Sequence, residues 1–231
     1  MKDKTFWITM ILIIAVAIVG LFFLAKSLET DSGQLSLMRP VNDQDHSRGP
    51  VDAEVVLVEY ADFECSGCAV IKPIIDEVFN EFDGQVRHVF RHYPLLSIHE
   101  KALITAQASE AASVQGKFWE MHDILFENQE LWVVIIEEQE MFDILAFFAQ
   151  EIGLDVDQFN EDLNTDAIVD EIGTDLQGAL EMGLTSTPTI FINGDMLRLN
   201  TQDDIRDAVV DILSPLEIGG SVELEGETIL E

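Results

Sequence analysis

The stretch VVLVEYADFECSGC, residues 55–68, decides the fold class of this 231-residue chain. Its first six residues form a short, valine-rich run bounded by acidic and turn residues, which is typical of a buried strand. The only two cysteines of the chain, Cys65 and Cys68, follow this run. Residues 69–82 then carry apolar side chains at helical spacing. The sequence therefore predicts a Cys-x-x-Cys pair at a strand-to-helix junction.

The position of this pair predicts different roles for its two thiols. Cys65 falls at the predicted helix N-terminus, where unpaired backbone N–H groups and the helix dipole stabilise a thiolate. A lowered thiol pKa makes such a cysteine both an available nucleophile and an easily expelled leaving group. We therefore predict that Cys65 attacks and that Cys68, about one helical turn further on, resolves. Ser66 and Gly67, which separate them, are predicted to face the substrate.

Two other roles for the cysteine pair are disfavoured. A structural zinc site normally needs four Cys or His ligands, but there is no second cysteine pair and the five histidines do not repeat at ligand spacing. A purely structural disulfide would close too short a loop to stabilise the fold much. We therefore predict no metal and no cofactor other than a redox-active disulfide between Cys65 and Cys68.

The elements outside the cysteine motif predict an α/β domain with a helical insertion at about residues 98–182. The predicted elements are a strand at 86–93, helices around 100–115, 117–126, 138–152, 156–163 and 166–182, strands at 189–192 and 196–199 joined by an Asn193-Gly194-Asp195 turn, and a helix at 201–213 with Thr201 as its N-cap. The domain is predicted at 51–213, after a tether at 26–50 that contains a short strand around 35–38, and before an acidic tail at 214–231.

An apolar segment precedes this domain. Residues 6–25 contain no charge, and twenty helical residues span about 30 Å, the thickness of the hydrocarbon core of a bilayer. No small-x-small cleavage site follows, so we predict an uncleaved transmembrane signal anchor in preference to a cleaved signal peptide. Lys2 and Lys4 indicate that residues 1–5 stay in the cytoplasm. The remainder is then single-pass anchored outside the cytoplasm, where disulfides persist.

The charge balance restricts the possible partners. The chain has 12 Lys and Arg against 44 Asp and Glu, a formal net charge of −32. Such a surface repels nucleic acid and disfavours anionic substrates, so no nucleic-acid partner is predicted. General acidity of the proteins of the source organism, as in salt adaptation, is the simplest explanation. Recognition of basic clients and binding of divalent cations are the alternatives.

Three further residues bear on the cysteine pair. Glu59 lies in the otherwise apolar strand, six residues before Cys65. A buried carboxylate there could accept a proton from Cys68 through water as mixed disulfides resolve, whereas an edge-facing glutamate would have no such role. Thr187 and Pro188 directly precede the strand TIFI, where a proline fits because it cannot donate to the ladder. A cis bond would present the Thr187 backbone to an extended substrate.

These motifs resemble those of the DsbA-like thioredoxin family over about residues 48–213. The matching runs are VVLVEYADFECSGC, RHYPL, IHEKA, QGKFWEMHDILF, IGLDVDQF and STPTIFINGD. The resemblance implies a thioredoxin fold with a helical insertion, a nucleophilic Cys65, a resolving Cys68 and a cis Pro188 facing the disulfide. It also implies that Glu59 is the buried acid and that Thr187 binds substrate backbone.

The same resemblance implies an activity and partners. Members of the family mostly oxidise exported polypeptides with free thiols and are reoxidised by a quinone-linked membrane thiol oxidase of the DsbB or VKOR type. Strongly oxidising relatives often have Pro-His where this chain has Ser66-Gly67, which implies a milder oxidant, and many members have glycine where Ser186 stands. A disulfide reductase or isomerase using the same cysteines, or a tethered chaperone with a non-catalytic disulfide, are the alternative functions.

The remaining candidates are predicted to be structural. His99 is interpreted as a structural residue that caps a helix, and His88 and His92 as packed or solvated strand residues rather than metal ligands. Core or groove-lining positions are predicted for Trp119, Met121 and Phe126. The acidic pairs Asp203-Asp204 and Glu137-Glu138 are interpreted as solvated faces, with a surface divalent cation as the alternative.

Overall fold

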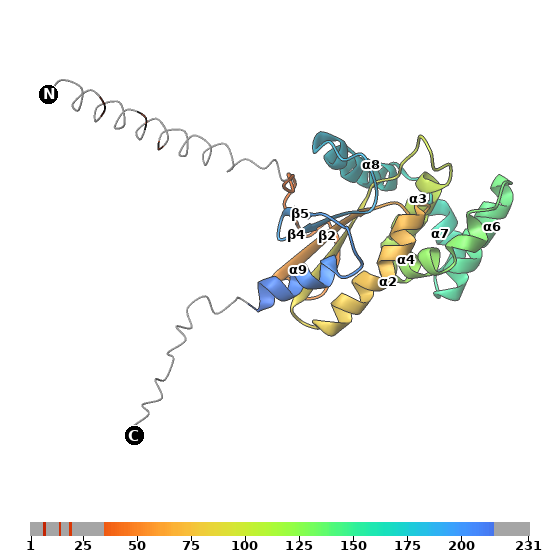
Figure 1. Ribbon diagram of the computed structural model, residues 1–231. Helices are drawn as coiled ribbons and strands as arrows, with labels where there is room; N and C mark the ends of the chain where they lie inside the picture. The colour runs from red at the N-terminus through yellow and green to blue at the C-terminus, as the bar shows by residue number, and fades with distance from the viewer. Residues whose placement is uncertain (1–6, 8–13, 15–18, 20–34, 215–231) are drawn as a thin grey trace. The chain divides into compact units, whose positions relative to one another are not determined.

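The computed structural model describes Trp7, Ile14, Val19 and residues 35–214 of the chain (Figure 1). The chain divides into two compact units, Met1–Leu35 and Ser36–Glu231, and the fold below is that of the second. The predicted cytoplasmic segment, all of the predicted anchor except Trp7, Ile14 and Val19, and the acidic tail after 214 lie outside the described residues. Within the described part, no helix is long and apolar enough to cross a bilayer.

A five-stranded mixed sheet in the order β1-β3-β2-β4-β5 forms the centre of the domain. Its central pair, β2 and β3, is parallel and buried along nearly its whole length, which accounts for the continuous apolar character of residues 55–60. The outer pairs β1–β3, β2–β4 and β4–β5 are antiparallel. The strands are β1 (His46–Arg48), β2 (Val55–Ala61), β3 (Val86–His92), β4 (Thr189–Ile192) and β5 (Asp195–Leu197).

Eight helices are present among residues 35–214 (Figure 1). They are α2 (Ser66–Glu81), α3 (Ala102–Val114), α4 (Phe118–Glu127), α5 (Gln129–Trp132), α6 (Glu138–Glu151), α7 (Val156–Asp162), α8 (Asp166–Glu181) and α9 (Asp204–Leu213). The five helices predicted within the insertion are confirmed, each to within two residues at either end. The short α5 was not predicted, because four residues carry too little periodicity to reveal a helix.

Two apolar clusters hold the domain together. One joins α2 and α9 to the sheet through residues such as Leu57, Ile75 and Ile205. The other fills the helical insertion and reaches the cysteine pair, with Trp132 and Phe159 fully buried in it. The strand-to-helix junction at the start of α2 therefore lies where the sheet meets the insertion, and it is packed from both sides.

The predicted tether at 26–50 is wrong for its C-terminal part, because residues 46–48 form β1 against β3. The preceding loop is fixed by charge. The fully buried guanidinium of Arg91 donates to both carboxylate oxygens of Asp45, at 2.8 and 3.0 Å, and to the carbonyl oxygens of Arg39 and Pro40. This loop is fixed by ionic contacts with distant residues and not by apolar packing. Its sequence therefore has no apolar periodicity from which its place in the domain could be predicted.

Two local predictions also require correction. The final helix begins at Asp204, not near Thr201, and Thr201 is a donor instead of the N-cap acceptor. Its N–H and hydroxyl both donate to the Asp204 carboxylate, at 2.8 and 2.7 Å, so Asp204 is also more than a solvated acid. The strand predicted around residues 35–38 is a single bridge between Ser36 and Asp195.

Candidate active site

The chain turns sharply between β2 and α2 and delivers Cys65 to the helix N-terminus. The Cys65 N–H donates to the Asp62 carbonyl oxygen at 3.0 Å, and the Cys65 carbonyl oxygen accepts from the Cys68 N–H at 3.1 Å. Cys65 is the extended N-cap residue of α2. Its exposed fraction is 9%, whereas that of Cys68 is 0%, and both are free thiols. Only Cys65 is thus positioned to meet another molecule.

The surroundings of Cys65 stabilise its thiolate. A hydrogen bond from the Cys68 thiol is the largest cause of a pKa lowered from 9.0 to about 5, against the opposing effect of burial. The Thr187 hydroxyl and the N–H groups of Gly67 and Cys68 lower it further, as expected for a helix N-terminus. The Thr187 hydroxyl is buried and has no hydrogen-bond partner among the described residues, so it is available to turn towards the sulfur.

Cys68 has the opposite electrostatics. Burial raises the pKa of its thiol well above 9.0, and the hydrogen bond to Cys65 and the charge of Glu59 raise it further. At neutral pH the pair therefore carries one negative charge, on Cys65, with the Cys68 proton directed at it. The roles assigned to the two thiols from sequence stay predictions, and the difference in exposure and charge agrees with them.

The Thr187–Pro188 bond is cis, as the resemblance implied, and it lies against the cysteines. The Cys65 Sγ is 3.4 Å from the Thr187 carbonyl oxygen. A Cβ built on Gly67 would lie 3.3 Å from Pro188 Cδ and 3.5 Å from Cys65 Sγ. Thus the small residue Gly67 lets the α2 N-terminus and the proline loop approach closely. Ser66, the other residue of the dipeptide, begins α2 and is exposed.

Glu59 is buried on the sheet, not edge-facing, with an exposed fraction of 1%. Its Oε2 is 3.1 Å from Nε2 of His88, and the Nε–H of Arg48 donates to Nδ1 of that ring at 3.2 Å. Because Nδ1 accepts from Arg48, we assign the ring proton to Nε2, from which it is donated to Glu59. The other oxygen of Glu59, Oε1, is buried and has no hydrogen-bond partner among residues 35–214.

This environment gives Glu59 a pKa suited to proton exchange. Burial raises it to about 7, although the nearby His122 and Arg48 oppose the shift. Burial also lowers the pKa of His88 to about 3, so His88 is a neutral donor. The free Oε1 is where a proton can be added without breaking the His88 contact. Sequence analysis interpreted His88 as packed or solvated and did not single out Arg48, because β1 was not predicted.

Residues from the insertion fix the loop before Cys65. The Gln129 amide, from α5, donates to the carbonyl oxygens of Phe63 and Cys65 at 2.6 and 3.1 Å. His99 Nδ1 is 2.8 Å from Asp62 Oδ2. His99 is therefore structural as predicted, but it contacts this loop and not a helix terminus. Met121 and Phe126 are core residues, as predicted.

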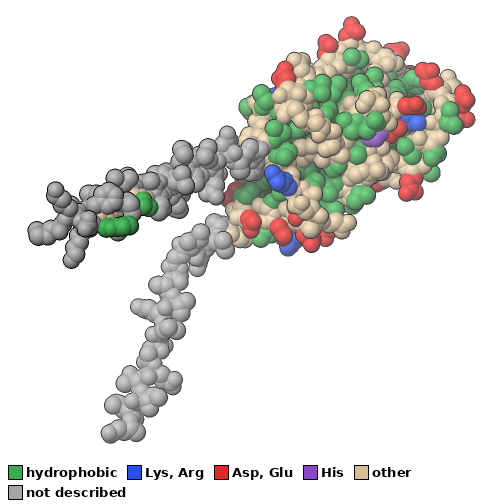
Figure 2. Space-filling model, turned by 45° about the horizontal axis from the view of Figure 1, so that its top comes forward, with side chains coloured by type: hydrophobic (Ala, Val, Ile, Leu, Met, Phe, Trp, Pro, Cys, Tyr) green, Lys and Arg blue, Asp and Glu red, His purple; other side chains and the backbone are tan. Residues whose placement is uncertain are grey.

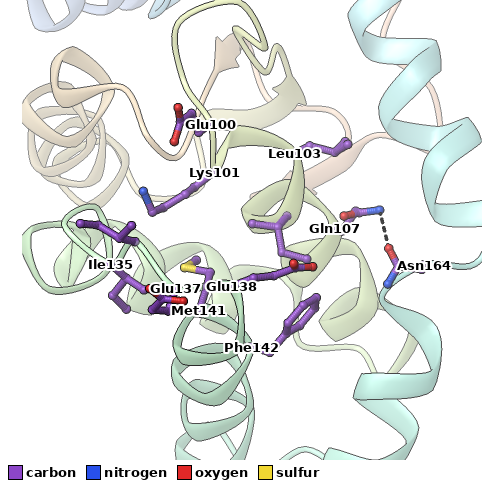
Figure 3. A pocket seen from close by; sticks show the side chains of 12 residues that line it. Glu100, Lys101, Leu103, Gln107, Ile135, Glu137, Glu138, Met141, Phe142 and Asn164 are labelled. Carbon is purple, nitrogen blue, oxygen red and sulfur yellow. Dashed lines mark hydrogen bonds between the residues drawn. The ribbon is translucent and has the colours of Figure 1, made fainter.

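A pocket of about 420 Å³ lies between α3 and α6, and neither cysteine lines it (Figure 3). Its apolar part includes Ile135, Met141 and Phe142. At its rim the Lys101 N–H donates to the carboxylate of Glu64, the residue before Cys65. The rim of this pocket is thus bonded to the residue that precedes Cys65.

Comparison with known proteins identifies the family. A family model described as Thioredoxin matches residues 41–211, which is most of the chain. The chain belongs to the thioredoxin family. Among solved structures, its fold is similar to BdbD from Bacillus subtilis, with a TM-score of 0.67 and 24% identity, covering 78% of this chain and 98% of that one. It is also similar to DsbA2 from Pseudomonas aeruginosa, with a TM-score of 0.58 and 24% identity, covering 78% and 100%. The predicted thioredoxin fold of DsbA type, with its helical insertion, is confirmed.

The relatives of this thioredoxin-family chain among curated proteins carry the name of an antiporter, unlike the solved structures with a similar fold. It is 42% identical over 163 residues to the Na(+)/H(+) antiporter NhaA 1 of Mycolicibacterium vanbaalenii, covering 69% of this chain and 25% of that protein. It is 40% identical over 168 residues to the protein of the same name from Salinispora arenicola, covering 72% and 24%. The chain thus spans about a quarter of the length of these relatives.

Proposed function

We propose that this thioredoxin-family protein is an extracytoplasmic thiol–disulfide oxidoreductase that introduces disulfide bonds into exported polypeptides with free thiols. The observation that carries the proposal is the position of Cys65 at the N-terminus of α2, partly exposed beside a fully buried Cys68, where the pKa of Cys65 is lowered to about 5. A stabilised Cys65 thiolate favours the dithiol form of the protein, so its disulfide readily accepts electrons. This favours an oxidase over a reductase or isomerase, even without a histidine between the cysteines.

The chemistry proceeds by two exchanges at one disulfide. A client thiolate attacks Cys65 Sγ, the Cys65–Cys68 bond breaks, and Cys68 leaves as a thiolate. A second client thiolate then attacks the client sulfur of the mixed disulfide and expels the Cys65 thiolate. The client loses two electrons and gains a disulfide, while Cys65 and Cys68 gain those electrons.

Glu59 supplies the proton that the first exchange requires. The thiolate of Cys68 is expelled into a fully buried position, where its own pKa is well above 9.0. With a pKa of about 7, Glu59 is partly protonated at neutral pH and can hand its proton to Cys68. Thr187 and Pro188 bind the client backbone beside Cys65, and exposed apolar side chains such as Val70, Leu96 and Ile98 suit an unfolded polypeptide.

Residues 6–25 are proposed to anchor the domain outside the cytoplasm, since they form an uncharged run of bilayer length. The reduced pair is proposed to be reoxidised by a quinone-linked membrane thiol oxidase of the DsbB or VKOR type. On the face shown in Figure 2, apolar side chains gather over the middle and acidic ones lie mostly around the outline, which suits contact with basic, partly unfolded clients.

The proposal is tested by incubating the purified oxidised protein with a reduced, denatured disulfide protein and following the return of client activity. Stoichiometric reactivation by the wild type, and none by Cys65→Ala, is expected. Undiminished reactivation by Cys65→Ala would exclude the proposal. Thiol trapping in intact cells separates the alternatives, because a mostly oxidised pair indicates an oxidase and a mostly reduced pair a reductase or isomerase.

Replacing Glu59 with glutamine is expected to slow the oxidation of a client thiol by about 10- to 100-fold, because glutamine cannot protonate Cys68. The loss is expected to shrink above pH 7, where Glu59 is already ionised in the wild type. Stopped-flow measurement of the first exchange against pH checks this. Glu127→Gln, at an exposed position on α4, removes the same charge and is the matched control. Equal rates and parallel pH profiles for both variants would contradict the role of Glu59.

A further inference from the structure

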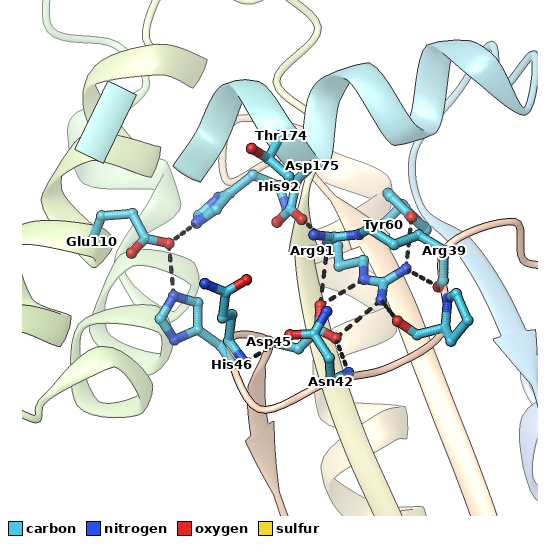
Figure 4. Close-up of polar contacts among 12 residues, drawn as sticks. Arg39, Asn42, Asp45, His46, Tyr60, Arg91, His92, Glu110, Thr174 and Asp175 are labelled. Carbon is cyan, nitrogen blue, oxygen red and sulfur yellow. Dashed lines mark hydrogen bonds and ion pairs between the residues drawn. The ribbon is translucent and has the colours of Figure 1, made fainter. Parts of the chain in front are cut away.

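Three potential metal ligands from separate elements meet away from the cysteines. His46 lies in β1, His92 in β3 and Glu110 in α3. The Nε2 atoms of both rings point at the same carboxylate oxygen, Oε1 of Glu110, from 2.7 and 2.8 Å (Figure 4). One potential ligand atom from each residue lies within 4.8 Å of the others. The proposed thiol chemistry uses none of them.

We propose that His46, His92 and Glu110 bind a divalent transition-metal ion, with zinc as the reference cation. Two imidazole nitrogens and one carboxylate form a donor set that suits Zn²⁺ and its neighbours in the first transition series. Calcium and magnesium prefer oxygen ligands only, so they suit this set poorly. The histidines are far apart in sequence, which is why ligand spacing along the chain did not reveal them.

The positions of the ligand atoms fit such an ion with small adjustments. Zinc binds imidazole nitrogen and carboxylate oxygen at about 2.0–2.2 Å, so two ligand atoms on one ion are at most about 4.3 Å apart. At the tetrahedral angle two such ligand atoms lie about 3.4 Å apart, so both separations to Oε1 must widen by about 0.6 Å, and each ring must move its proton to Nδ1. His92 and Glu110 are almost fully buried, so the packing around them holds both side chains near the position that a bound ion would need.

An access route and a further carboxylate lie next to the three ligands. A cavity of about 290 Å³ is lined by His46, Glu110 and Glu171, so an ion can reach the first two from solvent. Glu171, from α8, brings another carboxylate to the wall of this cavity. Ser113 donates its hydroxyl hydrogen to Oε2 of Glu110 at 3.2 Å and so orients the carboxylate, as outer partners of metal ligands commonly do.

A bound ion would clamp the edge of the sheet to the helical insertion. β1 is only three residues long and is attached to the edge of the sheet by its pairing with β3. Joining it to β3 and α3 through one metal would stabilise this attachment, because an ion that binds only the folded state shifts the folding equilibrium.

Zinc binding to the full-length chain in mild detergent tests the proposal. The protein is first oxidised, so that Cys65 and Cys68 form a disulfide and do not compete for the metal. Calorimetric titration with zinc is expected to show one ion per chain and a micromolar or tighter Kd, with a Tm raised by about 5 °C at saturation. The absence of saturable binding by the oxidised wild type would overturn the proposal.

His46→Gln separates a metal site from a simple hydrogen-bonded bridge. Glutamine can still donate an N–H to Glu110 from a position near that of Nε2, but its amide is a poor zinc ligand. His46 is only half-buried on an edge strand, so this variant is expected to fold. We expect zinc affinity to fall at least about 100-fold, while the Tm without zinc falls only by the loss of the ring stacking between His46 and Phe118.

Glu151→Gln, at an exposed position in α6, removes an acidic residue far from the cluster in sequence and is the matched control. It is expected to bind zinc as the wild type does. Unchanged zinc affinity in His46→Gln would overturn the proposal, as would an equal loss in Glu151→Gln, which would indicate diffuse attraction by the acidic surface. The cobalt-substituted wild type adds a spectroscopic readout, since a site without thiolate gives d–d bands and no sulfur charge-transfer band.

Discussion

Cys68→Ala is expected to convert the protein into a covalent trap for its clients. Without Cys68, a client sulfur bonded to Cys65 can be displaced only by a thiol of the client itself, so mixed disulfides last longer and accumulate. In the wild type the Cys68 thiol is hydrogen-bonded to Cys65, which makes resolution intramolecular and fast. We therefore expect reducible complexes of high mass to rise from undetectable to a large share of the protein.

The balance of this reaction is simple. The Cys65 thiolate attacks a disulfide sulfur of an oxidised client, a Cys65–client disulfide forms, and the client thiolate that leaves takes up a proton from water. The measurement is non-reducing electrophoresis of whole-cell extracts after acid quenching, followed by identification of the captured polypeptides. Cys65→Ala is the matched control, because its remaining thiol, Cys68, is fully buried. Complexes of equal abundance in Cys65→Ala would show that Cys68 is the attacking thiol and contradict the assignment.

The sequence was informative where structure depends on local pattern. The strand before the cysteines, the helix after them and the five long helices of the insertion each display their own periodicity, and the order of these elements is sufficient for the fold class. Cys65, Cys68, Pro188 and Thr187 could be predicted as neighbours because their motifs have fixed positions in this fold.

Contacts between distant polar residues could not be predicted in the same way. Arg48 meets His88, which in turn contacts Glu59, only because β1 lies beside β3, and β1 has neither length nor apolar alternation to reveal it. Similarly, His46 and His92 converge on one carboxylate from different strands. A buried ionic network leaves no periodic pattern in the sequence. The segment that contains β1 was therefore predicted to be part of a tether.

As pH rises from about 5 to 8.5, the free energy of unfolding of the reduced protein is expected to increase relative to that of the oxidised protein. The folded state holds the Cys65 pKa at about 5, against 9.0 for an ordinary thiol. An acid whose pKa is lower in the folded state than in the unfolded state stabilises the fold. This stabilisation is complete only above the pKa of the unfolded state, and it is lost as pH falls through the pKa of the folded state. The oxidised protein has no Cys65 thiolate, so it lacks this contribution at every pH.

The expected change in the difference between the two unfolding free energies is about 2–4 kcal/mol over this range, below the unscreened limit because Cys65 is partly exposed to solvent. The short disulfide loop adds to this difference a constant that does not depend on pH. The dependence of the difference on pH therefore tests the prediction, whereas its sign does not. Urea unfolding of both forms at several pH values gives the slope. Cys65→Ala corrects for all other titrating groups, since it should follow the oxidised protein. Parallel curves for the reduced and oxidised forms would mean that Cys65 titrates as an ordinary thiol, and the electrostatic basis for an oxidising disulfide would then be absent.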